Sequence, residues 1–312
     1  MKYKLFEANE QLGFNFPFIL IMPDKLKKHP KIYVEGANSV LYAQDGQQSL
    51  EAQIKFAKDY ADYLTEPQDG RRFNAAYLMQ QLNEPLLIPI IERCDFEHQG
   101  EFYTQMLGRN VVTTKEGKYA NLSQQVLNMI NYVKTGFNIN FQEKNGLIGM
   151  STSGVFAGRM LFLEPESFDV CLSICSNAVQ PLPIPELFNN KLPYPLGTAD
   201  YEQITGKKFN EEEYRKAQQL FIVGKQEDNS KYNIVNNPLL HDEEVQEWYK
   251  KLYGDVTLQE RQEEIDYVFD ELGYENVKCI LAEGGHNFNY KGNLIMNFVR
   301  SLEDIDELKY GE

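Results

Sequence analysis

One short stretch, residues 145–165, constrains the fold more than any other part of the chain. The apolar pair Leu147-Ile148 leads into a turn of small residues, and a helical pattern follows that ends at Pro165. This order predicts a strand, a sharp turn and a helix. Within the turn, Ser151 has a small residue two positions before it and another two positions after it.

Such spacing is the nucleophile-elbow pattern, in which small neighbours let strand and helix crowd together and push the serine hydroxyl out of the bend. Gly149 occupies the first small position. Ser153 occupies the second, where a glycine is commoner, and Gly154 follows it directly. Because Ser153 is also small, we expect the elbow to form.

Other apolar runs predict a mostly parallel central sheet with helices on both faces. These runs are 31–36, 85–91, 168–175, 219–224 and 277–282. The sequence between them is long enough for crossover connections, which is typical of a parallel sheet in an α/β fold. Pro89 is unusual for a parallel strand because it lacks a backbone donor.

The ends of the chain add a hairpin and a helix to this sheet. Runs 3–6 and 16–22, separated by Asn and Gly, predict an antiparallel hairpin at the sheet edge. Helical spacing of apolar residues is found at 47–64, 123–136 and 294–302.

We expect a single domain over residues 1–312. Apolar residues make up 42% of the chain and charged residues 25%, which are globular values. Two connections, 176–218 and 229–275, are much longer than usual, and long insertions beside a catalytic edge commonly form a lid.

Charge excludes several classes of partner. The formal net charge is -15, so the chain should repel nucleic-acid backbones and anionic membrane surfaces. The first residues lack the apolar core of a signal peptide, and no apolar run is long enough to span a bilayer. We therefore expect a cytoplasmic protein without nucleic-acid or membrane partners.

The four cysteines lie in or beside apolar runs, which favours buried reduced thiols over a zinc site or a disulfide; they are Cys94, Cys171, Cys175 and Cys279.

A serine in an elbow needs a histidine to take its proton and an acid to orient that histidine. His286 follows the strand expected at 277–282 and is flanked by glycines, so it should lie over the same sheet edge as Ser151. The acid should follow the strand at 219–224, where Glu227 and Asp228 are adjacent candidates. The spacing favours Glu227 and the residue type favours Asp228; we lean slightly to Asp228 and keep both.

The oxyanion of an acyl-transfer reaction needs two backbone N–H donors. Thr152, directly after the serine, should supply one. The other should come from the loop after the strand that ends near Gly36, so Ala37 and Asn38 are the candidates.

Taken together, these residues resemble the α/β-hydrolase superfamily over most of the chain. Within it, the chain looks most like bacterial serine esterases of the polyhydroxybutyrate-depolymerase and feruloyl-esterase-like branch. Departures from that pattern are Ser153 in the elbow and Glu35-Gly36 where a His-Gly pair is common.

The resemblance implies an α/β-hydrolase fold with a lid and a carboxylic-ester hydrolase that works through an acyl-enzyme on Ser151, without a metal or organic cofactor. A small soluble ester is the expected substrate. Three alternatives stay open. Two are amide or peptide hydrolysis and acyl transfer by the same triad, and the third is a catalytically silent hydrolase-like binding protein.

Overall fold

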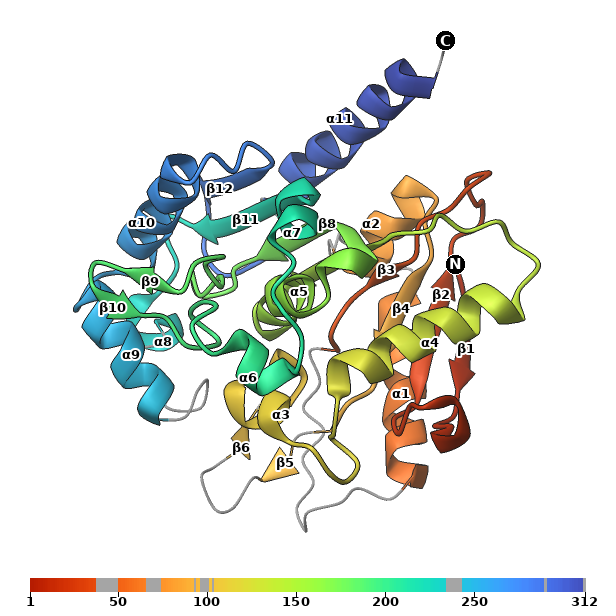
Figure 1. Cartoon of the computed structure of the whole chain (residues 1–312). Coiled ribbons are helices and arrows are strands. Elements are labelled where there is room, and N and C mark those ends of the chain that lie inside the picture. Colours follow the sequence, from red (N-terminus) through yellow and green to blue (C-terminus); the bar gives the residue numbers. More distant parts are fainter. Residues whose placement is uncertain are drawn as a thin grey trace.

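The computed structural model describes residues 1–37, 50–65, 74–92, 94–95, 101–102, 104–233, 243–288 and 291–310. An eight-stranded sheet lies at its centre, in the order β1-β2-β4-β3-β7-β8-β11-β12 (Figure 1). The strands of this sheet are β1 (Lys2–Phe6), β2 (Phe18–Met22), β3 (Tyr33–Val34), β4 (Leu86–Pro89), β7 (Asn145–Met150), β8 (Phe168–Ile174), β11 (Gln218–Gly224) and β12 (Val277–Ala282). Two short pairs lie outside it, β5 (Cys94–Asp95) with β6 (Glu101–Phe102) and β9 (Glu186–Leu187) with β10 (Asn190–Lys191).

The pairing confirms the predicted mostly parallel sheet. From β4 through β12 every neighbouring pair runs parallel, whereas β1 and β2 form the expected antiparallel hairpin and β2 pairs antiparallel with β4. Pro89 is the last residue of β4, and β3 pairs only with Leu86 and Leu87 of that strand. No ladder bond from residue 89 to β3 is therefore needed, which explains how the proline is accommodated.

Helices cover both faces of the sheet, as predicted. The α-helices are α1 (Leu50–Thr65), α2 (Ala75–Leu82), α3 (Arg109–Thr113), α4 (Leu122–Gly136), α5 (Thr152–Leu163), α6 (Tyr201–Thr205), α7 (Glu211–Lys216), α8 (Asn229–Tyr232), α9 (Glu243–Tyr253), α10 (Leu258–Glu271) and α11 (Gly292–Tyr310). Short 3-10 turns are η1 (Glu10–Leu12), η2 (Thr104–Met106) and η3 (Pro165–Ser167). One apolar cluster joins the sheet to α4, α5, α9 and α10, and a second joins its other face to α1, α2 and α11. No helix in the described ranges has the length and apolar character needed to cross a bilayer.

Helix α5 is buried along its whole length, between the sheet and the outer elements (Figure 1). A helix in such a position must be apolar on every side, which explains the run of Val, Phe, Ala, Met and Leu in its sequence. Its one charged residue, Arg159, is fully buried and donates a hydrogen bond to the carbonyl oxygen of Met106 at 3.1 Å. The helix therefore serves as the central packing element of one face.

The bend between β7 and α5 depends on two glycines. A Cβ on Gly149 would lie 2.1 Å from the carbonyl oxygen of Ser153, and one on Gly154 would lie 2.8 Å from that of Ile174. Both distances are far below a van der Waals contact, so no larger residue fits. The Ser153 hydroxyl donates to the carbonyl of Met150 at 3.0 Å. Gly154 thus provides the second close approach, while Ser153 closes the turn.

The two long connections help to cover the sheet. Helix α10, within residues 229–275, packs against β11 and β12. In residues 176–218, Tyr201 and Tyr214 are buried and their rings contact the ring of Phe162 from α5. Both segments therefore contribute to the core. The lid and the single-domain organisation stay predictions.

Of the predicted cysteine positions, Cys171 and Cys175 are buried free thiols and Cys279 is a partly buried one. The side chain of Cys94 is not among those that the structure describes.

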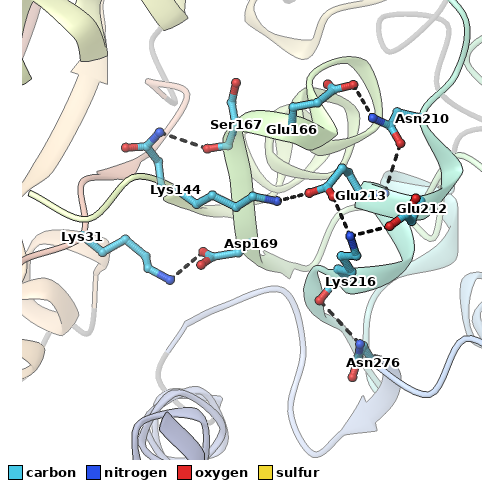
Figure 2. A network of polar contacts seen from close by, with 11 residues as sticks. Lys31, Lys144, Glu166, Ser167, Asp169, Asn210, Glu212, Glu213, Lys216 and Asn276 are labelled. Atoms are coloured by element: carbon cyan, nitrogen blue, oxygen red, sulfur yellow. Dashed lines mark hydrogen bonds and ion pairs between the residues drawn. The ribbon is translucent and has the colours of Figure 1, made fainter. Parts of the chain in front are cut away.

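A polar network ties α7 to the starts of β7 and β8, at the sheet edge where these strands begin (Figure 2). The carboxylate of Glu213 accepts hydrogen bonds from the ammonium groups of Lys144 and Lys216. These bonds lower the pKa of Glu213 from its usual 4.5 to about 2. Nearby, Lys31 pairs with Asp169 at 2.5 Å.

We expect Glu213→Gln to remove a pH-dependent part of the stability. Because the pKa of Glu213 is lower in the folded state, its contribution is complete above the unfolded value of about 4.5 and is lost as pH falls toward 2. Urea denaturation from pH 6 to pH 3 should show the wild type more stable at pH 6 and the difference narrowing toward pH 3. Glu212→Gln, at a carboxylate that is 79% exposed, should have a smaller effect. A difference that is constant with pH would contradict this assignment.

We expect Gly149→Ala to destabilise the fold by at least roughly 1 to 3 kcal/mol, the usual cost of overpacking, because its Cβ meets rigid backbone. Gly158→Ala in the same helix is the control. Its Cβ would lie 3.5 Å from the Phe221 ring, an ordinary contact, so replacement should be neutral or stabilise by up to about 1 kcal/mol. Chemical denaturation of both variants tests this prediction. Equal stabilities would show that the bend tolerates a larger residue.

Candidate active site

Hydrogen bonds between neighbouring strands line up the ends of β7, β8, β11 and β12. The Ser151 N–H donates to the Ile174 carbonyl at 2.8 Å, and the Cys175 N–H donates to the Ile222 carbonyl at 2.6 Å. Farther along the sheet, the Lys225 N–H donates to the Ala282 carbonyl at 2.8 Å. Because these strands run parallel and in register, the residues that follow them lie at one sheet edge. The serine, the acid candidates and the histidine loop all emerge there.

Ser151 has an unusual backbone conformation, with φ 60° and ψ −124°. A positive φ places a non-glycine residue in a sparsely populated region that costs on the order of 1–3 kcal/mol. Ser151 immediately precedes the first residue of α5, as the elbow pattern predicts. The strain arises because the chain reverses between two packed elements within a few residues.

The structure joins His286 to Glu227. The Nδ1 atom of His286 lies 2.8 Å from Oε2 of Glu227, and the N–H of Gly224 donates to the other carboxylate oxygen at 2.7 Å. Glu227 is 4% exposed. Since a carboxylate only accepts, Nδ1 carries the proton and Nε2 is the basic nitrogen of the neutral ring.

Asp228 does not make this contact, which corrects the slight preference for it. Its carboxylate accepts from the N–H and the hydroxyl of Ser230, at 2.9 and 2.7 Å, and it caps the start of α8. The reason is a tight turn in which the Glu227 N–H donates to the Gly224 carbonyl at 3.1 Å. Residue 227 is buried by this turn, whereas residue 228 is exposed.

Close approach of two loops makes the pair possible. A Cβ on Gly224 would lie 2.4 Å from the Gly284 carbonyl oxygen and 2.8 Å from that of Gly285. Glycine at position 224 therefore lets the histidine loop contact the end of β11. This contact brings the His286 ring within reach of the acid.

The Glu227 carboxyl has a lowered pKa. Burial alone would raise it, but hydrogen bonds from His286, from the Gly224 N–H and from the Cys175 thiol outweigh burial. Burial, and then the adjacent Glu227 charge, raise the pKa of the Cys175 thiol. At neutral pH the acid is therefore ionised and the thiol is protonated.

Cys175, Glu227 and His286 also form a group whose potential metal-ligand atoms lie within 4.8 Å of one another. The ammonium group of Lys291 contacts the Cys175 thiol and opposes binding of a second cation there. A protonated thiol is likewise a poor ligand, because metals bind the thiolate. The chemistry of this group therefore favours hydrogen bonding over metal binding.

Two residues that sequence reasoning missed hold the histidine in place. Lys291 is fully buried, and its ammonium donates to the carbonyls of Gly285 and Asn287 at 2.6 and 3.1 Å, on either side of His286. Tyr232 stacks on the imidazole, with ring centroids 3.8 Å apart and an angle of 7° between planes. No motif marks either residue. Tyr232 is distant from His286 in the sequence, and the Lys291 contacts lie within the irregular segment that carries His286 itself.

The oxyanion candidates lie near the same edge. Thr152 is the buried first residue of α5, and Ala37 is buried in the loop after β3. A Cβ on Gly36 would lie 2.7 Å from the Phe156 ring, so that loop packs directly on α5. Asn38 lies outside the described residues. The oxyanion role of these residues stays a prediction.

Glu35, one of the departures from the family pattern, is buried at the start of that loop. Burial raises the pKa of its carboxyl to about 8, so it is mostly protonated at neutral pH. Within the described part of the chain, its Oε2 atom has no hydrogen-bond partner.

Comparison with known proteins gives a structural match only. No model of a known protein family and no curated protein sequence matches the chain. Poly(aspartic acid) hydrolase-1 from Sphingomonas sp. KT-1 is similar in structure, with a TM-score of 0.53, 12% identity, and coverage of 96% of this chain and 98% of that chain. The serine hydrolase FphF from Staphylococcus aureus has a TM-score of 0.50, 13% identity, and coverage of 96% and 97%.

These matches extend over nearly the whole of each chain and agree with the observed strand order and helix placement. The chain therefore has the α/β-hydrolase fold, as its sequence motifs predict.

Proposed function

We propose that this protein is a serine hydrolase that cleaves carboxylic esters through an acyl-enzyme on Ser151. The observation that carries the proposal is the 2.8 Å contact between Nδ1 of His286 and the buried carboxylate of Glu227, at the sheet edge where Ser151 sits in a strained bend. A nucleophile, a base and an orienting acid are the parts that acyl transfer to a serine requires.

In the proposed reaction, the Ser151 hydroxyl attacks the ester carbonyl while Nε2 of His286 takes its proton. The imidazolium then gives this proton to the departing alcohol, and water removes the acyl group by the same steps. Glu227 stabilises the imidazolium because its charge is desolvated and held by the Gly224 N–H.

The oxyanion would be bound by the N–H of Thr152 and by one from Ala37 or Asn38. Removing one such donor typically raises a barrier by about 3 to 4 kcal/mol, so two donors account for a large share of the rate. The Thr152 N–H lies at the first turn of α5, where the helix dipole also favours negative charge.

A small ester without negative charge is the proposed substrate class. One structural neighbour is described as a hydrolase of poly(aspartic acid), an anionic polymer with amide bonds. The net charge of -15 on this chain opposes binding of such a polyanion. Substrate panels would also detect amide hydrolysis or acyl transfer by the same residues. A panel in which no substrate turns over would favour the binding-protein alternative.

We expect a fluorophosphonate probe to add once to the wild type and not to Ser151→Ala, because only an activated serine attacks the phosphorus centre. Intact-mass analysis measures the adduct, and circular dichroism checks that both proteins are folded. A folded wild type that gains no adduct would rule out the proposed nucleophile and favour the binding-protein alternative. Matched acetate and acetanilide substrates would then compare ester with amide cleavage.

We expect Glu227→Gln to lower kcat for p-nitrophenyl acetate by roughly 10³- to 10⁴-fold, because an amide cannot stabilise the imidazolium and favours the wrong tautomer. Asp228→Asn is the matched control one residue away. It should keep the rate within about threefold, because asparagine can still cap α8 and the Asp228 side chain does not contact His286. A larger loss in Asp228→Asn than in Glu227→Gln would reverse the assignment of the acid.

A further inference from the structure

We infer that Tyr232 is a positioning residue for His286 and keeps the imidazole plane fixed during the reaction. This inference rests on the proposed function, in which His286 is the base. Three features of the structure support it: the stacking geometry, the anchoring of α8, and the rocking motion of the imidazole that the Glu227 contact leaves unrestrained.

The stack is close and nearly parallel. The two ring centroids are 3.8 Å apart and the planes differ by 7°, so the phenol ring covers one face of the imidazole. Tyr232 is half-buried, which leaves part of the ring accessible at the edge of the site.

Helix α8, which carries Tyr232, is anchored at both ends. At its start, Asp228 caps the helix, and Asn229 accepts from the Leu258 N–H at 2.6 Å and donates to Gln259 at 2.9 Å. Directly after it, the Asn233 side chain accepts from the buried Arg261 at 3.1 Å. A helix of four residues would not be stable alone, so these bonds to α10 fix the position of the Tyr232 ring.

The contact with Glu227 and the stack restrain different motions. A hydrogen bond at Nδ1 fixes the direction of the ring but allows it to rock about the Nδ1···Oε2 line. A ring lying flat against the imidazole blocks this rocking, so Nε2 keeps its aim. Misplacing a catalytic group by about 1 Å can cost roughly 100-fold in rate.

The experiment compares Tyr232→Leu with Tyr232→Phe, which keeps the ring. Steady-state hydrolysis of p-nitrophenyl acetate gives kcat and KM from pH 5 to pH 9, and the rate of fluorophosphonate labelling reports activation of Ser151 separately. We expect Tyr232→Leu to lower kcat and the labelling rate by roughly 10- to 100-fold with little change in KM. Tyr232→Phe should restore kcat and the labelling rate to near wild type.

A wild-type rate in a folded Tyr232→Leu variant, or an equal loss in Tyr232→Phe, would overturn the inference. Tyr232→Met supplies a second non-aromatic side chain, with the same expectations, if the leucine variant does not fold. A wild type that is not labelled at Ser151 would overturn the proposed function as well, so the two failures are distinguishable.

Discussion

The close approach of β7 to α5 is the constraint on which the rest of the molecule depends. Gly149 and Gly154 let the buried helix begin within one residue of the strand end, and no side chain fits at either place. Because α5 packs against β7 and β8 and is buried throughout, its position determines how the neighbouring strands and the aromatic residues of 176–218 pack together. The same bend forces Ser151 into its conformation, so packing and site geometry have one cause.

A second close approach, at Gly224, organises the acid and histidine loops. There the end of β11 contacts the carbonyls of residues 284 and 285, and the tight turn to Glu227 buries a carboxylate. Such a carboxylate is tolerated because His286, the Gly224 N–H and the Cys175 thiol donate to it. Lys291 binds two backbone carbonyls of the histidine loop and Tyr232 covers the imidazole face, so His286 is restrained by the backbone, by charge and by stacking.

The sequence predicted the sheet and the sheet edge at which Ser151 and His286 lie, since both follow from local pattern; the catalytic roles of these residues stay predictions. Parallel strands bring their ends to one edge, so apolar runs followed by Ser151 and His286 were enough to place these residues there. The choice between Glu227 and Asp228 could not be made, because adjacent carboxylates differ only in the turn that points one inward. The Tyr232 contact was not predictable because stacking depends on how separate loops meet, and the Lys291 contacts were not predictable because they depend on the irregular path of the histidine loop. Ser153 departs from the usual elbow pattern without disturbing the bend, because Gly154 makes the close approach to the Ile174 carbonyl.

The backbone at residue 151 has a consequence for folding stability. A glycine there would adopt the positive φ without the strain that a side chain causes. Under the proposed function, the strained serine supplies the nucleophilic hydroxyl. The elbow would then hold a nucleophile in a fixed place at a cost in folding stability.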